Sequence, residues 1–108
     1  MKTIYEGEYR NVAVDVKRKA GATSYVVSVP ERRVLDANKV GVAGYDTFAA
    51  ATYDSVTNKV IMLFDTRVAA LSAPGTYYVQ LRAVITPTAG SAERYVAQIT
   101  VNVKDLGP

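Results

Sequence analysis

Two clusters of basic residues are the most concentrated charge in the sequence. One is the Lys-Arg-Lys run at 17–19 and the other is the pair at 32–33. A phosphate-binding surface needs several basic side chains on one face, and single-strand binding also needs aromatic rings among them. Asp15, Glu31 and Asp36 lie close to these clusters, and the net charge is only +3. We therefore expect a solvated turn and a solvated edge here, and nucleic acid is not an expected partner.

The chain has few of the residue types that catalysis uses. It contains no histidine and no cysteine, which excludes Ser–His and Cys–His pairs, disulfides and zinc sites built on those ligands. Carboxylate pairs and lysine chemistry stay formally open. Asp46, Asp54 and Asp65 are scattered, whereas calcium needs several oxygen ligands in one loop, so turn chemistry explains them better. The sequence predicts no enzyme, no metal and no cofactor.

The elements that would position any site are strands, because apolar and polar residues alternate with period two along most of the chain. This pattern predicts one domain, residues 1–108, folded as an all-β antiparallel sandwich of six to eight strands with at most one short helical turn. The expected strands are Tyr9 to Arg18, Ser24 to Val29, Tyr45 to Tyr53, Val60 to Phe64, Tyr77 to Thr86 and Arg94 to Val103, with further pairing within 31–39.

Three local features qualify this pattern. Pro30 has no N–H for a ladder, so it either ends the preceding strand or places it at a sheet edge. Residues 45–53 contain three alanines that favour helix, but their aromatic and threonine residues favour strand, and 54–59 has the composition of a hairpin connection. Residues 65–71 fit the helical turn, with Asp65 or Thr66 as its N-cap.

Tyrosine is the unusual component of the composition, with eight residues against two phenylalanines. Tyrosine is enriched at protein interfaces, although it also simply fits strands. In the strand from 77 to 86, alternation places Tyr78, Arg82 and Val84 on the face opposite Tyr77. These three residues are our candidate interface.

The stretch from 71 to 79 narrows the choice among the possible types of β-sandwich. Leu71, a short turn containing Gly75, and then Tyr77 at a strand start resemble the corner between the two sheets of an immunoglobulin-like sandwich. In that corner a tyrosine hydroxyl turns back to the backbone upstream. The alternative interpretation of this stretch is an ordinary strand start that happens to contain a tyrosine. The disulfide and buried tryptophan of antibody domains are absent from this chain.

The order of features from 45 to 103 resembles small immunoglobulin-like domains of tailed-phage structural proteins, especially the N-terminal domain of upper-baseplate proteins. The matching features are the strand of 58–65, the turn of 66–71 and the Pro-Gly-Thr-Tyr-Tyr-Val-Gln run of 74–80. The chain departs from the pattern at 19–21, where Lys-Ala-Gly replaces an extended Asp-Gly turn, so the pairing of the first two strands stays open. The family offers no catalytic residues to carry over.

The resemblance implies a non-enzymatic assembly component of a phage particle, whether baseplate, tail or head accessory. Its expected partners are other virion proteins and further copies of itself, in the virion and in the host cytoplasm during assembly. The basic clusters would then face an acidic neighbouring subunit. A carbohydrate- or surface-binding sandwich module is the alternative. No membrane association is expected, because charges follow Met1 at once and no apolar run approaches about 18 residues.

Overall fold

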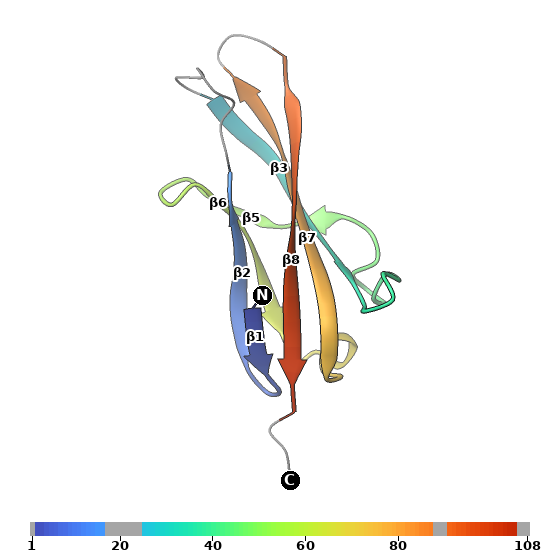
Figure 1. The fold of residues 1–108 in the computed structure, drawn as a ribbon. Coiled ribbons are helices and arrows are strands. Elements are labelled where there is room, and N and C mark those ends of the chain that lie inside the picture. The colour runs from blue at the N-terminus through green and yellow to red at the C-terminus, as the bar shows by residue number, and fades with distance from the viewer. Residues whose placement is uncertain (1, 17–24, 88–90, 106–108) are drawn as a thin grey trace.

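The computed structural model describes residues 2–16, 25–87 and 91–105. These residues form eight strands and one 3-10 turn, which confirms the predicted all-β class (Figure 1). The elements are β1 (Lys2–Tyr5), β2 (Tyr9–Asp15), β3 (Tyr25–Leu35), β4 (Ala49–Ala50), β5 (Thr52–Asp54), β6 (Lys59–Asp65), η1 (Ala69–Leu71), β7 (Gly75–Pro87) and β8 (Glu93–Lys104).

The strands form two open sheets that face each other like a sandwich. One sheet has five strands in the order β1-β8-β7-β3-β4, and the other has three in the order β2-β6-β5. The molecule is elongated, with principal extents of 56 × 24 × 19 Å. The expectation of a fully antiparallel sandwich is wrong at one place, because β1 pairs with β8 in parallel. Nearly the whole chain separates these two strands, so no hairpin forces them to run in opposite directions.

The strand β7 is paired along nearly its whole length, with β3 on one side and β8 on the other. Its inner residues Tyr77, Val79, Leu81 and Ala83 are buried, while the residues between them are half-buried on the outer face. This is the alternation that the sequence predicted for 77–86.

The strand β3 runs through Pro30 and lies between β7 and β4, so neither predicted effect of this proline, an ended strand or an edge strand, is found. The pairing with β7 shifts register between Ser28 and Glu31, and Val29 has a φ of 50°. This bulge accommodates proline's missing N–H without ending the strand. It also turns Val29 outward, where its exposed fraction is 58%, although an unbroken period-two alternation would place it on the same face as Val27.

Residues 45–53 form two short strands in place of the single predicted strand. β4 pairs with β3 in the large sheet, and β5 pairs with β6 in the small sheet. The change of sheet occurs at Ala51, whose N–H donates to the Pro30 carbonyl at 2.9 Å. The predicted hairpin after residue 53 is confirmed, since Asp54 pairs with Lys59.

One hydrophobic cluster fills the space between the sheets. Its largest fully buried side chain, Phe64 of β6, meets the Tyr77 ring of β7 edge-to-face at a centroid distance of 5.6 Å. The other buried hydrophobic members are Ile4, Val12, Val16, Val34, Val42, Val60, Met62, Leu71, Val79, Leu81, Ala83, Val101 and Val103.

The predicted N-cap of the helical turn is wrong. η1 begins after Val68, which has an extended conformation and makes no side-chain capping bond. Thr66 is buried, and its hydroxyl and backbone N–H both donate to the Glu8 carbonyl. Its role is therefore to tie the β1–β2 turn to the end of β6.

The corner before β7 brings the three predicted residues into one turn. Leu71 is fully buried, and Gly75 has a φ of 141°, which side-chain-bearing residues rarely adopt. The Tyr77 hydroxyl donates to the Ala73 carbonyl at 2.7 Å. Burial, with a smaller contribution from Asp36, raises the pKa of Tyr77, so the neutral donor form is favoured.

Replacing Tyr77 by Phe removes this hydrogen bond and keeps the ring in the core. We expect the free energy of unfolding in urea to fall by about 1 kcal/mol, the net value of one such bond. Tyr78→Phe is the control, because the Tyr78 hydroxyl makes no hydrogen bond to the described residues, and its change should stay within about 0.5 kcal/mol. Equal effects of the two substitutions would contradict a special role for the Tyr77 hydroxyl.

Candidate interaction surface

The outer face of the five-stranded sheet carries all three predicted interface residues. Tyr78, Arg82 and Val84 alternate with the buried residues of β7 and are half-buried. Their spacing of two and four residues places them in one line along the strand, on the face away from β2, β5 and β6. We refer to this surface, formed by the outward residues of β3, β7 and β8 with Phe48, as the outer face.

A chain of polar side chains crosses three strands of the outer face. The Arg33 Nε donates to the Gln80 Oε1 at 2.9 Å, and the Gln80 Nε2 donates to the Gln98 Oε1 at 3.1 Å. The three residues sit opposite one another because the register pairs Arg33 with Gln80 and Gln80 with Gln98. Cross-strand pairs of this kind hold side chains in place on a sheet.

Arg82 is fixed from two directions. Its Nε donates to the Glu31 Oε1 at 2.9 Å, with both side chains only 22% exposed. Its guanidinium carbon lies 3.6 Å from the centre of the Phe48 ring, and that of Arg33 lies 4.7 Å from the same ring. Phe48 therefore holds two arginines against the sheet through cation–π contacts.

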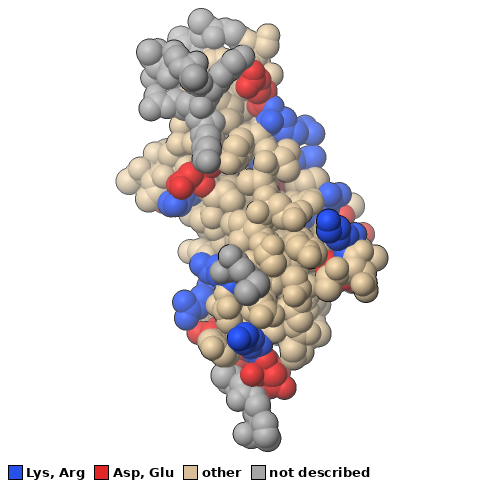
Figure 2. Space-filling model, in the orientation of Figure 1, with Lys and Arg blue, Asp and Glu red and all other residues tan. Residues whose placement is uncertain are grey.

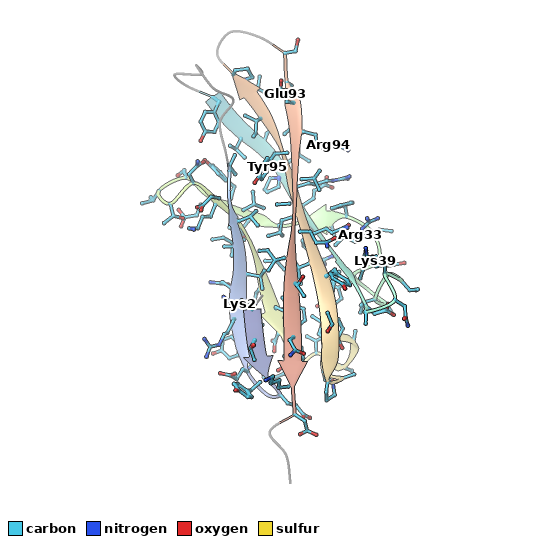
Figure 3. All side chains as sticks on the ribbon, in the orientation of Figure 1. Lys2, Arg33, Lys39, Glu93, Arg94 and Tyr95 are labelled. Carbon is cyan, nitrogen blue, oxygen red and sulfur yellow. The ribbon has the colours of Figure 1, made fainter. Side chains whose placement is uncertain are left out.

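Tyr78 lies further down the same strand and pairs in register with Leu35. The Lys39 ammonium lies 5.7 Å from the centre of its ring. Figure 3 labels Arg33 and Lys39, which lie on the same side of the ribbon. Tyr78 is thus one end of a surface rich in arginine and aromatic side chains, the types most enriched at protein interfaces.

The outer face is apolar around Val84, near the C-terminal end of β7 and the start of β8. Val84 pairs with Ser28 on one side and Arg94 on the other, so Val26 and Val96 are its diagonal neighbours. Val26 is 67% exposed and Val96 is 55% exposed. The outer face therefore combines a small valine patch with the fixed polar network.

Several members of this surface were missed by the sequence analysis. Period-two alternation would have placed Gln80 and Gln98 on the same face as the predicted residues, because each lies at an outward-facing position of its strand. No local signal marks Phe48, since its position depends on the pairing of β4 with β3.

The predicted solvated edge at 32–33 is wrong, because both arginines are half-buried within β3. Arg33 points to the outer face, whereas Arg32 points inward and its guanidinium carbon lies 4.5 Å from the centre of the Tyr45 ring. The buried Nη1 of Arg32 has no hydrogen-bond partner among the described residues. The other basic cluster, 17–19, lies outside the described residues.

Two of the scattered aspartates act as turn residues, as predicted. Asp54 accepts from the Val56 amide at 2.9 Å, and hydrogen bonds from the Thr57 side chain and from the Val56 and Thr57 amides lower its pKa. Asp65 accepts from the Arg67 side chain and amide, which lowers its pKa. In residues 2–16, 25–87 and 91–105 no three acidic side chains gather in a way that could hold a metal ion.

Comparison with protein-family models, curated proteins and solved structures found no match to this chain. Within the described residues, no helix is long and apolar enough to cross a membrane.

The ion pair between Glu31 and Arg82 can be tested with a double-mutant cycle of Glu31→Gln and Arg82→Met. Because this pair is shielded and charge-assisted, we expect a coupling energy of about 1 kcal/mol in urea unfolding. The control cycle uses Asp15→Asn and Lys59→Met, whose side chains are 67% and 38% exposed and pair at 2.8 Å. Solvent screening should keep that coupling below about 0.5 kcal/mol. A coupling at Glu31–Arg82 no larger than the control would mean that this network is not rigid.

Proposed function

We propose that the sandwich is immunoglobulin-like. In that fold the second, fifth and fourth strands make one sheet, and the third, sixth and seventh make the other, counted without extra edge strands. Here β2, β6 and β5 form one sheet, and β3, β7 and β8 form the centre of the other, with β1 and β4 added at its edges. The hydrogen bond from the Tyr77 hydroxyl to the Ala73 carbonyl also supports the proposal, because it resembles the tyrosine corner of that fold.

We further propose that the protein is a non-enzymatic assembly component of a phage particle that binds other virion proteins through the outer face. The observation that carries the binding role is the fixed set of arginines around Phe48. Side chains that are already ordered lose little conformational entropy when a partner covers them. The valine patch beside them supplies apolar area.

The phage context rests on the sequence resemblance over residues 45–103. The absence of histidine and cysteine from the whole sequence supports a role without catalysis, because the commonest nucleophile–base pairs cannot form. Virion proteins and further copies of this chain are the proposed partners, and the virion is the proposed location.

The direct test is to measure binding of the purified chain to the structural proteins encoded beside its gene. We expect at least one to bind, and Val84→Lys should weaken that binding about tenfold, or 1.4 kcal/mol, because it places a charge in the apolar part of the contact. Val56→Lys is the matched control, since Val56 is 92% exposed in the connection between β5 and β6 of the other sheet.

Binding that Val84→Lys and Val56→Lys weaken equally would contradict the outer face as the contact surface. Binding to no co-encoded virion protein would contradict the assembly role. A reproducible hit on a glycan array in the latter case would favour the carbohydrate-binding alternative. Circular dichroism of both variants checks that each is folded.

A further inference from the structure

The strand β8 has an unpaired edge along its first part. β1 pairs with β8 only from Val101 to Lys104, while β7 occupies the other side of β8 from Glu93 onward. In Figure 1, β1 lies beside the lower part of β8 only. The described residues therefore leave one line of backbone N–H and C=O groups, from Arg94 to Thr100, without a strand partner on this side.

This edge lacks the features by which proteins usually block edge pairing. Residues 94–100 contain no proline, no glycine and no charge at an inward-facing position, and their register with β7 is continuous. Figure 2, in the same orientation, shows a broad uncharged area over the middle of β8.

The other edges described here are each protected or short. β4 and β5 have two and three residues, and the free edge of β3 ends in the bulge at Val29 and Pro30. β2 also has an unpaired side, but it carries a charged residue, Arg10, at an inward-facing position of the strand, in register with Phe64. An inward-pointing charge at an edge discourages the addition of a strand.

We propose that the open edge of β8 pairs with the same edge of a second copy, antiparallel, around a two-fold axis at Val96. Such an isologous contact joins the two five-stranded sheets into one continuous sheet. In this register Val96 faces Val96 of the second copy, Tyr95 faces Ala97, and Arg94 faces Gln98. This proposal specifies a surface for the self-association included in the proposed function.

The side chains suit this register on both faces of the sheet. On the outer side the 55%-exposed Val96 is covered by its own counterpart, and no like charges stand opposite each other. On the inner side the half-buried Tyr95 meets the small Ala97, so a large residue lies against a small one. Shifting the two-fold axis to Arg94 would place two arginines opposite each other, which like-charge repulsion disfavours.

Charges at the ends of the pairing also match. The register places Glu93 of one copy opposite Ile99 of the other, on the inner side of the sheet. Lys2 lies on the same side next to Val101, two residues further along β8. Two residues of a strand span about 7 Å, so the Lys2 ammonium can reach the Glu93 carboxylate of the second copy. Symmetry creates this opposite-charge contact twice.

A single strand-to-strand contact buries less surface than the roughly 1,200–2,000 Å² of stable complexes. We therefore expect a concentration-dependent dimer, which covalent trapping detects better than sedimentation. The chain has no cysteine of its own, so an introduced cysteine is the only one that can form a disulfide.

The experiment is oxidation of the full chain carrying Val96→Cys. Directly paired residues have Cα atoms about 4.5–5.5 Å apart, within the roughly 4.4–6.8 Å that a disulfide spans. We expect a disulfide-linked dimer to form much faster than with Val56→Cys, although Val56 is more exposed, at 92%. Val26→Cys is a second control, because Val26 is 67% exposed on the same outer face but on β3.

Gln98 provides a second, charge-based measurement. Gln98→Glu places a carboxylate opposite Arg94 of the second copy and should speed trapping of Val96→Cys several-fold. Gln98→Arg places two arginines opposite each other and should slow it by a similar factor. Gln98→Glu keeps an acceptor for the Gln80 Nε2, whereas Gln98→Arg removes it. Gln98→Met is therefore the control, because it removes the acceptor without adding a charge. Slowing by Gln98→Met as large as that by Gln98→Arg would mean that the effect is merely structural.

Trapping at position 96 no faster than at 56 and 26 would overturn the proposal. If the chain then still binds a co-encoded virion protein, the β8 pairing fails and the assembly role stands. If Val96→Cys is trapped rapidly but no virion protein binds, the pairing stands and the assembly role fails.

Discussion

The pairing of β7 on both of its sides is the constraint on which the rest of the structure depends. Its register with β3 and β8 places Val79 and Leu81 in the core and Gln80 and Arg82 on the outer face. A slip of one residue would exchange these two sets, which would bury a charge and expose the core. Core packing therefore fixes the outer face as firmly as it fixes the fold.

The outer face is completed by a segment that belongs to neither neighbouring strand of β7. The chain between Tyr45 and Asp54 runs from the large sheet to the small one, and Phe48 comes just before β4 pairs with β3. β4 pairs Ala49 with Arg32 in register, and the ring of Phe48, the preceding residue, covers the guanidinium groups of Arg33 and Arg82. The change of sheet thus supplies the aromatic centre of the surface.

Local periodicity correctly predicted those parts of the molecule whose structure is determined by the residues of a single strand or turn. The two faces of β7, the strand β8 and the turn around Asp54 follow from alternation and turn chemistry. The parallel pairing of β1 with β8 and the position of Phe48 depend on contacts between distant segments, which no local pattern records. The effect of Pro30 also depends on a distant segment, because the bulge that accommodates its missing N–H forms against the partner strand β7.

The polar network also supports the proposal that this charged surface binds a partner. An arginine side chain that becomes ordered on binding loses up to about 2 kcal/mol of rotamer freedom. Arg33 and Arg82 are already held by Gln80, Glu31 and Phe48, so most of that loss belongs to folding and not to binding. Toward the described part of the chain, each guanidinium group uses only some of its five N–H donors, which leaves the others for a partner. A partner with acceptors at matching positions therefore meets a surface whose geometry is set before it arrives.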